Sequence, residues 1–417
     1  MLRGEKPASK SRDLKVLNRL LVRETIRRQG PIARHEVAKL TGLTPPTVTV
    51  IVNELLAEGV VREIGFGEST GGRRPVMLAL NPRAGDVFAV RIQRGQAVTA
   101  LLDLGAEVLA SQVLRLESHL PGEVVEAVVG SCGQLLEATG IRLGDVFWCG
   151  VASPGLVDSS CGLVARSSNL DWENVPLGKM LSERLGEIPV HVENISNAAA
   201  VGERLFGSGR GCPNLIYLNL SVGIGAGIVI NGEIFGGARG YAGEVGHMVL
   251  VPEGGPRCAC GREGCFEALC GARTVLEKAK EVLDEEVLKR YGLKKDDLTI
   301  AEVVSRPLVE LPEIQEILAE VGAMVGIALA NLVSLFNPEM VVLGGELARA
   351  GSVLLEPATR VAKERALGEI VNPVRFVLSG MSQDPPLMGA YALALEKIFQ
   401  VDDWRTRPLR TASFARG

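Results

Sequence analysis

The sequence lacks the phosphate-binding motifs of the most widespread nucleotide-binding folds. Its 417 residues contain no GxxxxGK[ST] loop and no strand–GxGxxG–helix unit, so neither a P-loop nor a Rossmann-type dinucleotide site is expected. Glycine-rich turns do follow two expected strands, at residues 223–227 and 343–346. Such turns can bring backbone amides close to phosphate, but many are only tight turns. They do not define a function by themselves.

Long apolar runs and a secretion signal are also missing. The N-terminus, Met-Leu-Arg-Gly-Glu-Lys-Pro, is polar and has no apolar core of the signal-peptide kind. The most apolar stretch, Val321 to Phe336, contains Asn331 and Ser334 and is short for a membrane span. Gly322 and Gly326 within it have a spacing that suits close helix packing. We expect a buried helix here and a cytoplasmic protein.

The cysteines show no disulfide framework. Cys132, Cys149, Cys161 and Cys212 are scattered along the chain, as in proteins of a reducing compartment. The other four of the eight cysteines lie between residues 258 and 270, and they indicate a different chemistry.

One histidine and three cysteines follow a metal-binding spacing, His-x10-Cys-x-Cys-x4-Cys, formed by His247, Cys258, Cys260 and Cys265. One imidazole and three thiolates make the closed tetrahedral set that a structural zinc ion prefers. Neighbouring glycines let the chain double back, so that ligands close in sequence can face one ion. The pattern predicts a structural Zn²⁺ site. Cys270, just beyond it, is expected to be a small core residue.

Charge is distributed unevenly along the chain. Residues 1–83 hold 15 Lys and Arg against 8 Asp and Glu, a net charge of +7, whereas the remaining residues carry −11. A basic head on an acidic body suggests that the head alone meets a polyanion.

The basic head has the pattern of a helix-turn-helix. Apolar spacing predicts helices over residues 14–29 and 33–40, followed by the tight turn Thr41-Gly42-Leu43. Thr44 is a good N-cap for a third helix that runs to about Glu58. In this arrangement the last helix enters the major groove of DNA.

Two short strand-like segments after the third helix predict a wing. They span residues 60–64 and 75–80 and enclose a glycine-rich tip at residues 65–74. Arg73 and Arg74 edge this tip and are expected to reach phosphates or the minor groove. An ordinary solvated turn is the alternative.

The proposed recognition helix is unusual because it contains no Lys or Arg. Its candidate base-reading residues have short side chains and are Thr44, Thr47, Thr49 and Asn53. Lys15, Arg19 and Arg23 repeat every four residues along the first helix, either as phosphate contacts or as a solvated face. A winged helix that binds protein instead of DNA stays open.

From Asp86 onward, apolar strands alternate with helices, which predicts an α/β body in two lobes with a cleft between them. The expected strands are 88–92, 97–102, 146–151, 190–192, 215–220 and 226–230, and the expected helices are 124–138, 177–185, 196–205 and 391–398.

The predicted domains follow from these elements. They are a winged helix-turn-helix at 1–82, a body at 83–400 and a flexible tail at 401–417. Within the body, one lobe is expected over about 83–195 together with the C-terminal helix, and the other over about 196–385.

Several motifs together resemble the ROK family (repressor, open reading frame, kinase). They are Glu244-x-Gly-His247, the Cys-x-Cys-Gly-x2-Gly-Cys-x-Glu run that ends at Glu267, Glu193-Asn194, Asn197-Ala-Ala and Gly202-Glu203. The head, with Gly-Gly-Arg-Arg-Pro at its wing, is similar to that of the transcriptional repressors of the family.

The resemblance implies an actin-like, two-lobed ATPase-type fold of the sugar-kinase and ribonuclease H kind. It also implies a sugar in the cleft, held by residues that match the family's sugar contacts: Asn169, Asn194, Glu244, His247 and Glu267. Carboxylates and amides suit vicinal hydroxyls, which need donors and acceptors at fixed positions. His247 is expected to offer one ring nitrogen to the metal and the other to the sugar.

The departures from the family pattern indicate a loss of catalysis. The catalytic Asp of the family's kinases corresponds to Ile195, which cannot accept a proton. Their first phosphate loop, Asp-x-Gly-x-Thr, corresponds to residues 91–95, Arg-Ile-Gln-Arg-Gly, and the Thr of their Thr-Gly-x-Gly turn corresponds to Val222. Without a general base the rate falls about 10²–10⁴-fold. We therefore expect no kinase activity.

The chain is thus expected to be a sugar-responsive transcriptional repressor that binds operator DNA as a homodimer or higher homo-oligomer. The runner-up is an ATP-dependent sugar kinase that carries a DNA-binding head. A regulator whose effector is a phosphosugar or a partner protein is the third possibility.

Overall fold

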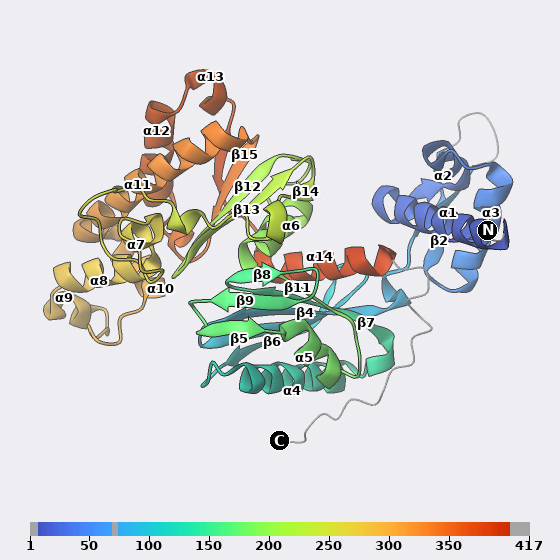
Figure 1. Ribbon diagram of the computed structural model, residues 1–417, viewed down its shortest axis with the longest axis horizontal. Coiled ribbons are helices and arrows are strands. Elements are labelled where there is room, and N and C mark those ends of the chain that lie inside the picture. Colours follow the sequence, from blue (N-terminus) through green and yellow to red (C-terminus); the bar gives the residue numbers. More distant parts are fainter. Residues whose placement is uncertain (1–6, 69–73, 401–417) are drawn as a thin grey trace, which may run out of the picture.

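The computed structural model describes residues 7–68 and 74–400, with side chains from residue 14 onward. It consists of a small N-terminal head and a larger body of two lobes (Figure 1). The predicted architecture, a winged helix-turn-helix followed by a two-lobed α/β body, is confirmed.

The head contains the expected helix-turn-helix. Its helices are α1 (Pro7–Gln29), α2 (Arg34–Thr41) and α3 (Pro45–Ala57). Gly42 ends α2 with a left-handed φ of 71°, and Thr44 caps the N-terminus of α3. The helix boundaries follow the sequence signals closely, except that α1 begins earlier than its apolar pattern indicates.

The predicted wing is a hairpin within a three-stranded sheet of order β1-β3-β2. Its strands are β1 (Ile32–Ala33), β2 (Val61–Phe66) and β3 (Val76–Leu80). Arg74, next to β3, is exposed, whereas Arg73 lies outside the described residues.

The buried face of α1 differs from the sequence prediction. The apolar spacing that predicted a helix over residues 14–29 is formed by Leu14, Leu17, Leu20, Leu21 and Ile26, which were expected to share one side of it. Leu14 and Leu17 are instead 61% and 60% exposed, while Val22 is fully buried. The side of α1 that faces α3 is charged at this level, since Lys15 Nζ lies 3.0 Å from Glu54 Oε1. Ion pairing with α3 therefore turns the first leucines outward.

The first lobe is built on a five-stranded sheet of order β11-β7-β4-β5-β6. Its strands are β4 (Asp86–Gln93), β5 (Gln96–Asp103), β6 (Val108–Arg115), β7 (Val146–Ser153) and β11 (Val190–Asn194). Alternate residues of β4 face opposite sides. Phe88 packs toward α4 (Pro121–Thr139) and α5 (Leu177–Arg184), and Val87 belongs to the cluster on the other face. The edge strand β6 escaped prediction because half of its side chains face solvent.

A small three-stranded sheet extends this lobe toward the second one. It is formed by β8 (Leu156–Asp158), β9 (Leu163–Ser167) and β10 (Trp172–Val175).

The second lobe contains another five-stranded sheet, of order β14-β13-β12-β15-β16. Its strands are β12 (Leu215–Leu220), β13 (Ile224–Ile230), β14 (Glu233–Ile234), β15 (Met340–Gly344) and β16 (Arg375–Leu378). The helices of this lobe are α7 (Phe266–Cys270), α8 (Ala272–Val282), α9 (Glu285–Arg290), α10 (Ile300–Val303), α11 (Pro312–Phe336), α12 (Ser352–Arg365) and α13 (Gly368–Val371).

Helix α11 is long and apolar enough to cross a membrane, yet 61% of its most apolar window is buried inside the protein. A Cβ on Gly322 would lie 2.7 Å from Leu354 O, so α11 packs directly on the backbone of α12. The prediction of a buried, closely packed helix is confirmed.

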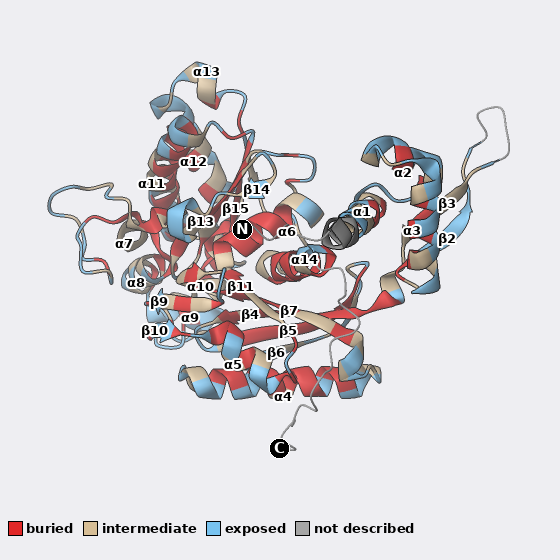
Figure 2. Cartoon of the chain, turned by 45° about the vertical axis from the view of Figure 1, so that its right-hand side comes forward, coloured by how far each residue is buried: buried red, intermediate tan, exposed pale blue. Residues whose placement is uncertain are grey.

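Two helices lie between the large sheets and join the lobes: α6 (Ile195–Phe206) and α14 (Pro385–Gln400) (Figures 1 and 2). Their contact leaves no room for side chains, because a Cβ on Gly389 would lie 1.6 Å from Ala198 O. On the other side of α14, a Cβ on Gly150 of β7 would lie 1.9 Å from Ala390 O. The two helices and the first sheet therefore form one tightly packed unit.

Candidate functional site

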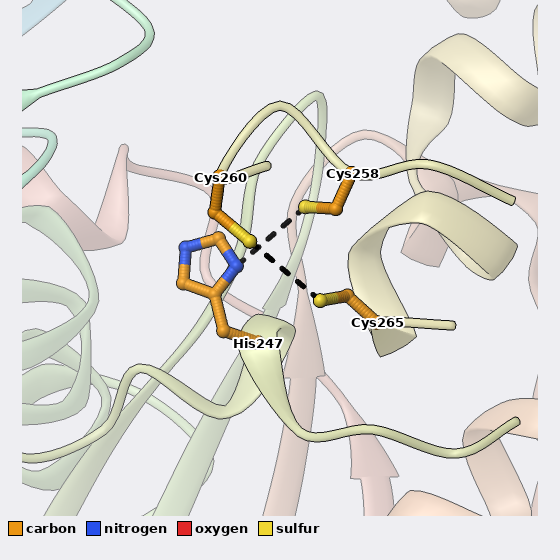
Figure 3. Close-up of side chains that lie close together, drawn as sticks. All are labelled: His247, Cys258, Cys260 and Cys265. Atoms are coloured by element: carbon orange, nitrogen blue, oxygen red, sulfur yellow. Dashed lines mark hydrogen bonds between the residues drawn. The ribbon is translucent and has the colours of Figure 1, made fainter. Parts of the chain in front are cut away.

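The four predicted metal ligands converge in the second lobe. The ligand atoms of His247, Cys258, Cys260 and Cys265 all lie within 4.8 Å of one another (Figure 3). Cys260 Sγ and Cys265 Sγ are 3.7 Å apart. Two thiolates on a tetrahedral zinc ion, each at about 2.3 Å, are about 3.8 Å apart, whereas a disulfide holds its sulfurs at about 2.05 Å. The arrangement therefore suits a tetrahedral ion.

A tight glycine loop brings these ligands together. Gly264 has a φ of 70°, and a Cβ there would lie 1.7 Å from Val251 O, so only glycine fits. The next residue, Cys265, bridges to Val249 and precedes α7, which carries Glu267. Cys270 is fully buried in the core, as predicted.

The predicted sugar-binding carboxylates flank the cysteine cluster. Glu267 Oε2 accepts a hydrogen bond from Ile224 N at 2.9 Å. His247 presents Nδ1 to Cys258 Sγ at 3.7 Å, while its Nε2 lies 4.0 Å from Glu244 Oε2. Burial raises the pKa of Glu244; His247 counteracts this effect and Glu267 adds to it. The half-buried carboxylates retain oxygens that can accept hydrogen bonds from a polyol.

Asn169 approaches this group from the first lobe. A Cβ placed on Gly223 would lie 2.8 Å from Asn169 Nδ2 and 3.3 Å from Glu267 Oε2. Residues from both lobes therefore meet at this turn. Sequence reasoning missed Arg94, whose Nη1 donates to Asn169 O at 3.0 Å and pairs with Asp171. Nothing local in the sequence could reveal a contact across 75 residues.

Asn194 has a structural task that sequence matching did not reveal. Its Oδ1 accepts hydrogen bonds from Ser196 N at 2.8 Å and Asn197 N at 3.3 Å, so it caps α6. Its Nδ2 donates to Gly155 O at 2.8 Å. One amide N–H remains for a ligand. The following residue, Ile195, is half-buried and packs on the apolar cluster around α14.

The segment predicted to correspond to the kinases' first phosphate loop, residues 91–95, contains its own ion pair. Arg91 Nε lies 2.8 Å from Asp384 Oδ2, immediately before α14, and Arg91 Nη2 donates to Gln96 Oε1 at 3.1 Å. A guanidinium therefore stands in this part of the cleft, already paired with a carboxylate.

The predicted base-reading residues lie on α3 as expected for a recognition helix. Thr44, Thr49 and Asn53 are exposed, whereas Thr47 is only half-exposed. The opposite face, which includes Val48 and Val52, is buried in the head.

Arg23 occupies a place that neither sequence interpretation anticipated. It is only 1% exposed, and its Nη2 donates to Phe399 O at 2.9 Å, at the C-terminal end of α14. Its guanidinium also stacks 5.1 Å from the centre of the Phe399 ring. Arg23 thus fastens the head to the body and is neither a phosphate contact nor part of a solvated face.

Comparisons with known proteins agree with this organisation. A model described as the ROK family matches residues 87–397, and one described as winged helix-turn-helix DNA-binding matches residues 12–62. A putative xylose repressor of Caldicellulosiruptor sp. is 31% identical over 94% of this chain and 98% of its own length. The Escherichia coli dual regulator NagC is 30% identical over 91% and 92%.

Similar solved structures include a transcriptional regulator and a sugar kinase, which match different shares of this chain. A ROK family transcriptional regulator, a homologue of the E. coli Mlc protein, has a TM-score of 0.79 with 26% identity and covers 93% of this chain and 100% of its own. A Streptomyces griseus ROK glucokinase, in complex with glucose and AMPPNP, has a TM-score of 0.65 with 27% identity. It covers only 75% of this chain and 100% of its own.

Proposed function

The chain belongs to the ROK family, and on that premise we propose that it is a cytoplasmic, sugar-responsive transcriptional repressor of carbohydrate-utilisation genes. The observation that carries this proposal is the length of the match: the relatives that align over head and body together are named repressors or regulators. The glucokinase accounts for three quarters of the chain.

The body senses and does not catalyse. Ile195 stands at the position of the family's catalytic base, and a hydrocarbon side chain cannot accept the proton of a sugar hydroxyl. Phosphoryl transfer also needs charge stabilisation around the phosphates and their metal ions. Arg91, paired with Asp384, supplies no carboxylate to such an ion. A sugar kinase with an added head is the alternative that these residues disfavour.

A structural zinc ion belongs to the proposal. Cys258, Cys260, Cys265 and Nδ1 of His247 supply four protein ligands, so no position is left for a reactive water. The ion supplies only cross-linking of the loop. Binding of the ion through Nδ1 would fix the ring plane of His247. It would leave Nε2 free to face the sugar beside Glu244.

The sugar is held between the lobes by residues with complementary tasks. Glu244 and Glu267 accept hydrogen bonds from hydroxyls, and the Asn169 amide can donate as well as accept. Asn194 contributes its one remaining N–H and, by capping α6, ties the site to the central helices. Two relatives of nearly equal identity are named for different sugars, xylose and N-acetylglucosamine, so relatedness does not name the effector.

The central helices carry the response to the head. Asn194 caps α6, α6 packs without side chains on α14, and α14 ends at the carbonyls that Arg23 binds. A shift of α6 on sugar binding must therefore move α14 and, through Arg23, α1. The sugar lowers operator affinity if it favours the arrangement in which the two heads of a homodimer no longer match the operator half-sites.

An operator-binding titration tests the proposal. Full-length, zinc-loaded protein is incubated with operator DNA recovered from its own promoter region, and mobility shifts are measured with a panel of free sugars and phosphosugars. We expect one sugar to weaken the complex selectively. Operator affinity that no member of a broad panel changes would remove the sensing part of the proposal. Sustained sugar-dependent release of ADP in a coupled assay would favour the kinase instead.

A further inference from the structure

The exposed face of α3 contains a large apolar side chain where base-reading polar groups are expected. Val50 is 56% exposed, and it lies between Thr49 and Asn53 on the side of α3 opposite the buried core. Among the described residues, none packs over this face of the helix. The helix therefore presents a hydrocarbon surface in the middle of the segment that a winged helix places in the major groove.

The threonines around Val50 use their hydroxyl groups within the protein. Thr44 Oγ1 and Thr47 Oγ1 are hydrogen-bonded to each other at 2.8 Å, and Thr44 Oγ1 also accepts from Thr47 N at 3.4 Å. Thr49 Oγ1 donates to Pro45 O at 2.8 Å. These hydroxyls cap and brace α3, so part of their hydrogen-bonding capacity is already used within the protein.

Two basic side chains near α3 are engaged in ion pairs within the head. Lys15 is paired with Glu54, and Arg34 Nη2 lies 3.1 Å from Glu63 Oε1. The helix itself has no Lys or Arg, and these are the residues that most often read guanine. The exposed side chains of α3 that can distinguish bases include the amide of Asn53, which suits adenine, and the methyl groups of Val50, which suit the 5-methyl group of thymine.

We infer that Val50 is a specificity-determining residue that packs against a thymine methyl group in each operator half-site, one or two base-pair steps from an adenine read by Asn53. The two residues are three positions apart on α3, a rise of about 4.5 Å, which is between one and two base-pair steps of about 3.4 Å. The inference rests on the proposed operator binding and states which bases α3 recognises.

The experiment begins with selection of binding sites from random double-stranded DNA by the full-length protein. Each thymine of the selected site is then replaced in turn by deoxyuridine, which removes one methyl group and leaves base pairing unchanged. Dissociation constants are measured for the wild type and for Val50→Ala. Val282→Ala, at another exposed helical valine, far along the chain on α8, is the matched control.

We expect one thymine in each half-site at which deoxyuridine weakens wild-type binding by about fourfold, the ratio that corresponds to burial of one methyl group. For Val50→Ala the same replacement should have no further effect, because the partner methyl groups are gone. Val282→Ala should behave as the wild type. Alanine is a better helix former than valine, so unfolding of α3 should not confuse the result.

The outcomes are distinguishable. If a sequence is selected but no single deoxyuridine weakens binding, or if Val50→Ala retains the full deoxyuridine effect, the inference is wrong and the proposed function stands. If Val50 has no role in recognition, Val50→Ala should bind every DNA site with the same dissociation constant as Val282→Ala, and the inference is then wrong. Failure to enrich any sequence would overturn operator binding itself, and the inference with it.

Discussion

At the scale of single residues, some polar side chains of the proposed site have two roles. One part of the side chain contacts the surrounding protein, and another part stays available for a ligand. Asn194 caps α6 and keeps one N–H for the cleft. His247 turns Nδ1 to the cysteines and Nε2 to Glu244. A substitution at such a residue therefore changes structure and binding together, and a useful test must measure both.

Replacement of one cysteine should separate ligand response from DNA binding. Cys260→Ser removes one of four proposed zinc ligands, so the loop that bears His247 and Glu267 should loosen. We expect loss of bound zinc and a weaker response to the effector, with operator affinity retained at first, because the head lies apart from the loop (Figure 1). Metal analysis and mobility shifts check this. Equal loss of both properties in a folded variant would contradict the division of tasks.

Asp86 should make stability depend on pH. Burial, together with the neighbouring carboxylates of Asp103 and Asp145, raises the pKa of Asp86 from 3.8 to about 6. The folded state therefore binds the proton more tightly than the unfolded state, and stability is lost as the pH rises from about 4 to about 6. Asp86→Asn should raise the melting temperature at pH 8, with a gain that shrinks to nothing near pH 4. Thermal unfolding at several pH values checks this, and a gain independent of pH would refute the assignment.

At the scale of elements, the glycines between α6, α14 and β7 determine how the lobes move. Backbone packed directly on backbone cannot slide without opening a gap, so these elements shift together. Helix α14 is also held at both ends. Asp384 before its first turn pairs with Arg91, and Phe399 in its last turn binds Arg23. Tyr391 adds a hydrogen bond from its hydroxyl to Asp103 O at 2.9 Å. Helix α14 therefore reaches from Arg91 at its first turn to Arg23 of the head at its last turn.

A methyl group between α6 and α14 should be poorly tolerated. Gly389→Ala would place Cβ 1.6 Å from Ala198 O, so the helices must separate, at a cost of about 1–3 kcal/mol or more. The matched control is Gly130→Ala in α4, where nothing lies within 4 Å of the new Cβ and up to about 1 kcal/mol should be gained. Chemical denaturation of both variants checks this. Similar stabilities would show that the helix contact is adaptable.

Removal of Arg23 should uncouple the head from the body. Arg23→Ala leaves the last carbonyls of α14 without this donor and should cost about 1–3 kcal/mol. Operator binding should persist, while the effector no longer releases the DNA. Lys15→Ala, two turns earlier and paired with Glu54 at the surface, should cost no more than about 1 kcal/mol and leave the response intact. Mobility shifts with and without effector decide the matter, and a normal response in Arg23→Ala would exclude this route.

At the scale of the whole molecule, a basic head and an acidic body are joined so that only the head is suited to DNA. The two lobes meet at Gly223, where Asn169 and Glu267 approach each other. The proposed sugar, bound there, would contact both lobes and favour the arrangement in which they are closed on it. Regulation by such a ligand needs no catalysis, only a difference in affinity between two arrangements.

Thermal unfolding against a panel of sugars should identify the effector. A ligand that binds only the folded protein stabilises it by about 2.7 kcal/mol at a hundredfold excess over its Kd. We expect one sugar or phosphosugar to raise the melting temperature of the zinc-loaded protein. Glu267→Gln should reduce that shift, while Glu285→Gln, at a surface residue of α9 paired with Lys289, should leave it unchanged. The absence of any shift would redirect the search to partner proteins.

The sequence determined the local structure and much of the chemistry. Helix caps such as Thr44, the wing and the His-x10-Cys-x-Cys-x4-Cys spacing act over a few residues, so they can be read from the chain. The family followed from motifs of the same kind, and the family match confirms it. Apolar segments located eight of the sixteen strands that the structure describes, among them β4, β5 and β7, whose sheet is covered on both faces.

Only the tertiary structure decided which polar groups remain available. Arg23, Arg94 and Arg91 have partners at Phe399, Asn169 and Asp384, far away along the chain. The outward turn of the first leucines of α1 likewise depends on ion pairs with α3. Hydrogen bonds and ion pairs form between groups that are close in space, however far apart they lie along the chain. A local sequence pattern therefore does not reveal these partners. For that reason the sequence could name candidate residues of the site, and the fold determined how these residues are connected to the head.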